Sequence, residues 1–197
     1  MDRTFNLFAE RPFNAYAHER FSAIAKSINN MSNVEVLMYK NDFDGLVRQL
    51  VKAYSLAPVS VSFEDKLVDL TSRPYRDHDR YFAEYTLSIS GDVNLLTLCP
   101  YKPGFVKIVV PAEIKTNVLI FEIDTQYYNA NLTPSVMENV KRAYLIIKDF
   151  ISESLLYLNN ESQKFNFEIE QFIIPVLANK LRVAQNHVEI REKLNFN

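Results

Sequence analysis

The sequence contains few glycines, one cysteine and no tryptophan. Its three glycines, Gly45, Gly91 and Gly104, are isolated from one another. This excludes a P-loop, a Rossmann glycine fingerprint and a nucleophile elbow, because each of these motifs needs glycines at close, fixed spacing. The single Cys99 excludes an internal disulfide and a zinc site built from several cysteines.

Long hydrophobic runs are also missing. No run approaches the ~18 apolar residues that a membrane span requires. The N-terminal residues 1–4 are largely polar, so we expect no signal peptide. With one cysteine, a reducing cytoplasm is the expected setting, without membrane contact.

The overall amino-acid composition is that of an ordinary folded protein. The 197 residues are 48% hydrophobic and 23% charged, which is typical of a folded globular chain. The net charge of −2 argues against a surface that is basic overall. Any nucleic-acid contact must therefore come from a local patch of basic residues.

The clearest pattern is a helical one over residues 133–158. Thr133 can cap this helix, and Pro134 suits its first turn. The apolar side chains recur at steps of three and four, which places them on one face: Val136, Val140, Tyr144, Ile147, Ile151, Leu155 and Leu158. Beyond Asn159 and Asn160 a second helical stretch follows, which Pro175 should kink or split. A long C-terminal helical pair is predicted.

The rest of the chain predicts two N-terminal helices and then a mainly antiparallel sheet. The fold class is therefore α+β. We expect domains over residues 1–130 and 131–197, or one single domain. The expected helices cover residues 14–30 and 42–57, and the expected strands cover residues 59–63, 81–89, 105–110 and 114–123. Residues 67–71 should continue the first strand or pair with it, and residues 73–80 should form a polar loop.

Two groups of basic residues are candidates for nucleic-acid binding. Arg73, Arg76 and Arg80 lie in the predicted polar loop, and the second group lies near the C-terminus, at Lys180, Arg182 and Arg191. The loop also contains Asp77-His78-Asp79. Neighbouring residues of an extended chain point to opposite faces, so these three side chains are a poor metal site. A solvated loop with internal ion pairs is the simpler interpretation.

A nuclease site is a weaker hypothesis. Glu64 and Lys66 follow a predicted strand and fit the Glu-x-Lys half of a PD-(D/E)xK nuclease, in which a carboxylate holds Mg²⁺. Asp42 or Asp44 would have to supply the other carboxylate, but helix capping explains both without chemistry. We therefore assign no catalytic residue, no metal ligand and no cofactor.

The apolar face of the long helix has two interpretations. It can pack within the chain, which is the commoner use of such a face, or it can form a homodimer seam. The residues of that seam would be Tyr144, Ile151, Leu155 and Leu158.

Residues 85–92, the Leu95-Leu96 pair and the segment 100–103 carry a resemblance. An alternating strand, a Gly-Asp turn and a Pro-Tyr-Lys-Pro segment, followed by a strand at 114–123 and a long helix at 140–158, resemble an accessory module of bacterial defence-type proteins. There the module precedes a PD-(D/E)xK nuclease-like or TIR effector domain. The resemblance implies a non-catalytic recognition or regulatory role, with an effector protein or a downstream effector domain as partner.

Three functional hypotheses follow. The first is a recognition module of a defence or restriction-type system, acting through DNA or protein contacts. The second is an oligomerisation scaffold that uses the helices at residues 133–190. The third is the Mg²⁺-dependent nuclease.

Overall fold

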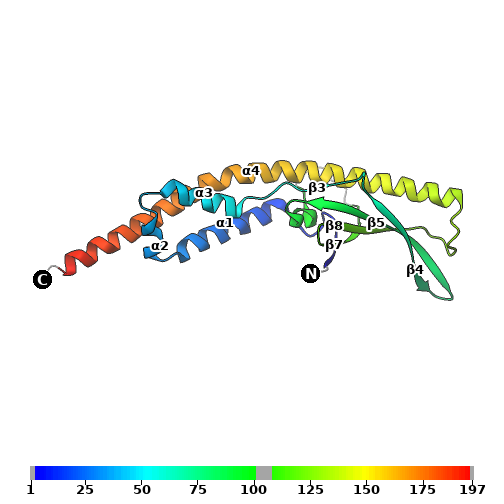
Figure 1. Cartoon of the computed structure of the whole chain (residues 1–197), viewed down its shortest axis with the longest axis horizontal. Helices are drawn as coiled ribbons and strands as arrows, with labels where there is room; N and C mark the ends of the chain where they lie inside the picture. Colours follow the sequence, from blue (N-terminus) through cyan, green and yellow to red (C-terminus); the bar gives the residue numbers. More distant parts are fainter. Residues whose placement is uncertain (1–2, 101–107, 196–197) are drawn as a thin grey trace. The chain divides into compact units, whose positions relative to one another are not determined.

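The computed structural model describes residues 3–100 and 108–195, and its fold is α+β, as the sequence predicts (Figure 1). Its helices are α1 (Phe13–Asn30), α2 (Asn33–Met38), α3 (Phe43–Tyr54), the 3-10 helix η1 (Val93–Thr97) and α4 (Pro134–Asn195). Its strands are β1 (Arg3–Asn6), β2 (Arg11–Pro12), β3 (Ser60–Val61), β4 (Leu67–Tyr75), β5 (His78–Ser90), β6 (Leu98–Cys99), β7 (Pro111–Lys115) and β8 (Val118–Asp124).

The chain divides into two compact units. Residues 1–13 and 57–160 form the first, called here the sheet unit, and residues 14–56 and 161–197 form the second, the helical unit. Helix α4 contributes to both. Neither unit boundary falls at residue 130. Separate folding of residues 1–130 and 131–197 remains a prediction.

The main sheet of the sheet unit is antiparallel. Its strand order is β1-β7-β8-β5-β3, and β4 pairs with β5 on the same side as β3. The single strand predicted over residues 114–123 is wrong, because Thr116 and Asn117 form a turn between β7 and β8. Both have positive φ angles, of 20° and 67°. Two consecutive positive φ angles suit a two-residue hairpin turn.

The core of the sheet unit lies between one face of this sheet and the first part of α4. Strand β5 buries Ala83, Tyr85, Leu87 and Ile89, which confirms the predicted alternation over residues 81–89. The ring of Tyr144 in α4 stacks on that of Tyr85, with 4.5 Å between the centroids. Fully burying a side chain such as Leu87 stabilises the fold by about 1.5–3 kcal/mol.

The helical unit is built from α1, α2, α3 and the second part of α4. The ring of Phe21 contacts those of Phe165 and Phe172, with centroids 5.0 and 4.9 Å apart. The side chain of Asn166 bonds both backbone groups of Leu56, accepting at 2.8 Å and donating at 2.9 Å. Asp42 caps α3 as predicted, by accepting from the Gly45 N–H. Only α1 and α3 were expected at the N-terminus, so α2 is an addition.

The predicted C-terminal helical pair is one helix instead. Asn159 lies inside α4, and its side chain accepts from the Val59 N–H at 2.9 Å and donates to the Val59 carbonyl at 2.8 Å. Pro175 also lies inside α4 and does not split it. Ile173 and Leu177, on either side of Pro175, are fully buried. Packing of this apolar face supplies the helical stability that proline lowers.

Two further predicted strands differ from those in the structure. The strand expected at residues 59–63 is reduced to Ser60–Val61. Of the strand expected at residues 105–110, positions 105–107 lie outside the described residues and 108–110 are not in a strand. In the described part of the chain, no helix has the length and apolar character needed to cross a membrane.

Candidate functional site

The arginine-containing segment at residues 73–80 is the tip of a hairpin, so the predicted loop is wrong. Strand β4 continues to Tyr75, β5 starts at His78, and only Arg76 and Asp77 form the turn. Arg76 adopts a φ of 53° there. The two strands pair residue by residue over nine positions, from Leu67 opposite Thr86 to Tyr75 opposite His78.

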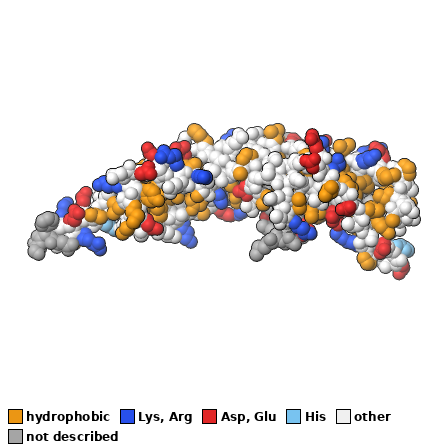
Figure 2. All heavy atoms as spheres, viewed as in Figure 1, with side chains coloured by type: hydrophobic (Ala, Val, Ile, Leu, Met, Phe, Trp, Pro, Cys, Tyr) orange, Lys and Arg blue, Asp and Glu red, His pale blue; other side chains and the backbone are white. Residues whose placement is uncertain are grey.

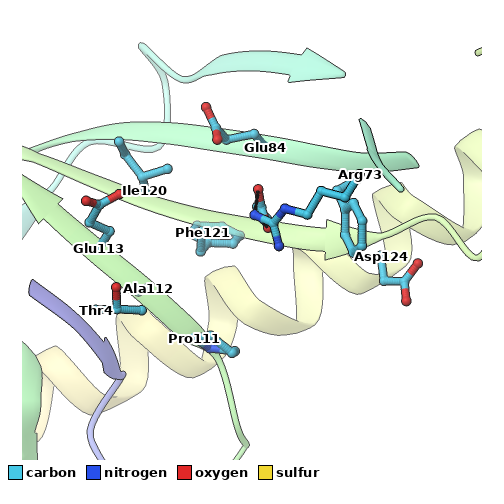
Figure 3. Close-up of a pocket in the computed structure, with 11 residues that line it drawn as sticks. Thr4, Arg73, Glu84, Pro111, Ala112, Glu113, Ile120, Phe121 and Asp124 are labelled. Carbon is cyan, nitrogen blue, oxygen red and sulfur yellow. Dashed lines mark hydrogen bonds and ion pairs between the residues drawn. The ribbon is translucent and has the colours of Figure 1, made fainter. Parts of the chain in front are cut away.

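Two of the three arginines are paired with carboxylates of β8. The Arg73 guanidinium donates to both carboxylate oxygens of Glu122 at 2.6 Å, and it lies over the Phe82 ring (Figure 3). Arg80 donates from Nε to Asp124 at 2.9 Å, and this hydrogen bond raises the pKa of Arg80. Pairing within the sheet reduces the positive charge that these two residues offer to a ligand.

Figure 3 shows Arg73 and Asp124 on the face of the sheet that points away from α4, called here the open face. A hollow of about 500 Å³ on this face is lined by Arg73 and by four carboxylates, Glu84, Glu113, Glu122 and Asp124. The described residues contain no group of three or more His, Cys, Asp or Glu side chains placed to hold a metal. The open face therefore carries carboxylates around Arg73.

The third arginine lies among exposed aromatic rings at the tip. Arg76 packs over the ring of Tyr75 at 5.5 Å, and Tyr75 and His78 both contact Tyr128, at 6.4 and 5.6 Å between ring centroids. Asp77 lies in the turn and Asp79 in β5. The structure brings arginine and aromatic side chains together at this tip.

The other predicted site residues are spread over the chain. Lys180 donates to the Asn29 carbonyl at 2.9 Å, Arg182 donates to the Asn179 side chain at 3.0 Å, and Arg191 lines a separate groove of the helical unit. Lys66 lies over the Tyr144 ring, 5.6 Å from its centroid.

The four residues of the predicted dimer seam lie inside the sheet unit. Tyr144, Ile151, Leu155 and Leu158 are each at most 8% exposed. They pack within the chain, so they do not form a surface to which a second copy could bind.

A feature that the sequence reading did not single out is the exposure of β4. Eight of its nine residues are exposed, whereas β5 alternates between buried and accessible positions. Leu67, Val68 and Leu70 expose 66%, 50% and 42% of their surface. Figure 2 shows hydrophobic side chains among charged ones around this hairpin, at the right of the view. A long, exposed and partly apolar edge strand is a template for pairing with another chain.

The hydrogen-bonding directions identify which backbone groups line the edge of β4. Tyr81 and Ile89 of β5 bond toward the β8 side, to Tyr127 and Asn117, at 3.1 and 2.8 Å. Because bonding directions alternate along a strand, the even-numbered residues of β5 bond toward β4. Their partners are the odd-numbered residues of β4, from Leu67 to Tyr75.

The backbone groups of the even-numbered residues of β4 therefore point away from β5. These residues are Val68, Leu70, Ser72 and Pro74. Within the described residues, no strand pairs with this side of β4. Pro74 has no N–H to offer, and prolines in sheets occupy such outward-facing positions.

A groove accompanies the edge on the α4 side of the sheet. It has a volume of about 570 Å³ and is lined by apolar side chains from β4, β5, the segment before α4 and α4 itself, among them Val68, Leu70, Tyr85, Leu132, Met137 and Val140. The exposed edge and this groove together form the candidate site. The sequence signal for this edge is the apolar content of Leu67, Val68 and Leu70 ahead of a clear strand, which indicates strand structure at residues 67–71 but not its exposure.

Comparisons with protein-family models, with curated proteins and with solved structures find no match to this chain.

Proposed function

We propose that this chain is a non-catalytic protein-interaction module that binds an extended polypeptide segment along the edge of β4. The observation that carries the proposal is the exposure of β4 on both faces, along an edge with which none of the described strands pairs. An added strand gains affinity from main-chain hydrogen bonds, and it gains selectivity from pockets that take alternate side chains. The groove beside Val68 and Leu70 is such a pocket.

Charge favours a polypeptide over DNA as the ligand. Arg73 and Arg80 are held by Glu122 and Asp124, and Glu84 lies on the same open face. A DNA-binding surface needs several cations that are available to phosphates. The polypeptide hypothesis retains the recognition role predicted from the sequence, but it takes a polypeptide instead of DNA as the ligand.

The resemblance to accessory modules of bacterial defence-type proteins supplies a setting for this proposal. In that setting the chain is the regulatory part, and the segment bound along β4 belongs to an effector. Catalysis is assigned to the partner.

The test is photo-crosslinking from two exposed positions in the full-length chain, expressed in cells. A benzoylphenylalanine probe replaces Leu67 at the edge, and the control probe replaces Ile146 on α4, which is similarly exposed at 58%. We expect the Leu67 probe to capture one discrete polypeptide that the Ile146 probe does not. Ser72→Pro, which removes an outward N–H, should reduce that capture.

The captured polypeptide is then purified and its affinity measured directly. Ser72→Pro should weaken binding about tenfold, the effect of losing ~1.4 kcal/mol of main-chain hydrogen bonding. Equal capture from both probes, or an affinity that Ser72→Pro leaves unchanged, overturns the proposed function.

A further inference from the structure

We infer that the polypeptide accepted by the edge of β4 is the β4 strand of a second copy of this chain, in an antiparallel pairing centred on Thr71. This inference rests on the proposed function, because it names the partner of the same site. Two independent features of β4 point to it: the charges along the strand and the directions of its backbone groups.

The charges of β4 are complementary to their own reversed order. Centring an antiparallel pair on Thr71 places Asp69 of one copy opposite Arg73 of the other, and it does so twice because of the two-fold symmetry. Shifting the pairing by two residues in either direction removes both matches. Opposite charges at directly opposed positions stabilise a strand pair, so charge selects this register.

Asp69 gains particular benefit from such a partner. In the sheet it lies directly opposite Glu84, which in turn lies opposite Glu122. Like charges at directly opposed positions destabilise a sheet. Arg73 already neutralises Glu122. Its side chain is still 61% exposed, and its guanidinium has donors left for Asp69 of the second copy.

The backbone directions agree with the same register. The outward-facing residues Leu70 and Ser72 of one copy meet Ser72 and Leu70 of the other, so each pair exchanges two main-chain hydrogen bonds. Val68 meets Pro74, whose carbonyl accepts the Val68 N–H. On the open face, Leu67 packs against Tyr75 of the second copy; these side chains are 66% and 39% exposed in the single chain. Pairing would cover both.

The first measurement is the mass of the wild-type chain by sedimentation equilibrium at tens of micromolar. We expect a species near twice 22.9 kDa. Ser72→Pro should shift it to the single-chain mass while leaving the circular dichroism spectrum unchanged. Asp69→Lys places a cation opposite Arg73 at two positions, and it should weaken the dimer about tenfold.

The decisive measurement is a disulfide at the two-fold axis. In the proposed pairing Thr71 faces Thr71 of the second copy as a non-hydrogen-bonded pair, with Cα atoms ~4.5 Å apart, which lies within disulfide range. Thr71→Cys should therefore form a 71–71 crosslink under mild oxidation, identified by peptide mapping. Leu67→Cys is the matched control on the same strand and face; it lies opposite Tyr75 and should not crosslink to itself.

A single-chain mass at these concentrations, with no more crosslinking from Thr71→Cys than from Leu67→Cys, overturns self-pairing. A dimer that Ser72→Pro leaves intact and that lacks the 71–71 crosslink also overturns it. Either result leaves the proposed function standing if the Leu67 photo-probe still captures a different polypeptide. If that probe captures nothing specific, the proposed function fails as well.

Discussion

Strands β4 and β5 are the two arms of one hairpin, yet they are built differently. β5 has neighbours along both sides and buries alternate side chains under α4. β4 has β5 on one side, and eight of its nine residues are exposed. The same backbone pairing thus joins a strand that stabilises the core to a strand that presents groups to solvent. This difference is the basis of our proposal that β4 makes contacts outside the chain.

The largest expected difference concerns side-chain truncation. Leu87→Ala in β5 removes a fully buried side chain and should lower the free energy of unfolding by about 3 kcal/mol. Leu67→Ala in β4 removes a side chain that is 66% exposed, and it should change stability by less than about 0.5 kcal/mol. Urea denaturation of both variants, below any dimer concentration, measures the two values. Similar losses would mean that β4 is buried in solution.

The next difference concerns backbone groups on β4 itself. Thr71→Pro removes an N–H that points toward β5, and it should lower the free energy of unfolding by about 2 kcal/mol through loss of a ladder bond. Ser72→Pro removes an N–H that points away from β5 and should cost much less. Thermal melts followed by circular dichroism compare the two. Equal melting temperatures would contradict the assigned bonding directions.

A smaller effect is expected at high pH, from tyrosines on the buried side of β5. Burial raises the pKa of Tyr85, aided by the nearby Tyr144, and burial raises the pKa of Tyr144. Both phenols therefore hold their protons more tightly in the folded state. Their stabilisation is complete below the unfolded pKa of about 10, and it is lost as the pH rises through the folded pKa.

The measurement is the free energy of unfolding between pH 9 and pH 11, a window around that reference value of about 10. Stability should fall across it, and Tyr85→Phe should make the fall shallower. A slope that is the same in the wild-type chain and in Tyr85→Phe would show that Tyr85 is not responsible.

The ion pairs at the hairpin should contribute little to stability. Arg73→Ala should lower the free energy of unfolding by about 0.5 kcal/mol, because the Arg73 side chain is 61% exposed and solvent screens its pair with Glu122. Glu122→Gln should have a similar effect, and the two changes together should cost less than their sum. A decrease in the free energy of unfolding above about 2 kcal/mol for Arg73→Ala would mean that the ion pair is shielded from water.

The smallest expected effect concerns DNA. Replacing Arg73, Arg76 and Arg80 by alanine should leave the anisotropy of labelled double-stranded DNA unchanged, since the wild-type chain should not bind it. Saturable wild-type binding that weakens steeply with salt, and that the triple variant loses, would restore the DNA hypothesis drawn from the sequence.

Much of the framework follows from periodicity. The helices predicted at 14–30 and 42–57, the start of the long helix at Pro134 and the alternation along residues 81–89 are strong local patterns, and the structure has them, with α3 ending at Tyr54. The α2 helix is marked by its capping box at Ser32 and Glu35, which also lowers the pKa of Glu35 through hydrogen bonds. That signal was readable from the sequence.

The candidate site could not be read in the same way. Residues 73–80 are polar because they are exposed, and exposure looks alike in a loop and in an edge strand. Thr116 and Asn117 turn the chain through positive φ angles without glycine, so the β7–β8 turn carries no strong marker. The continuity of α4 depends on packing on both sides of Pro175, which is a tertiary effect.

The order of the two units along the chain has a consequence for biosynthesis. β1 pairs with β7, so the N-terminal strand has no partner until more than half of the chain has left the ribosome. The ring contacts of Phe21 form later still, because its partners Phe165 and Phe172 lie in the second part of α4. Phe21 of the nascent chain therefore lacks these two ring contacts until α4 has been made. Because the first part of α4 belongs to the sheet unit and the second part to the helical unit, its emergence completes the sheet unit first and the helical unit last.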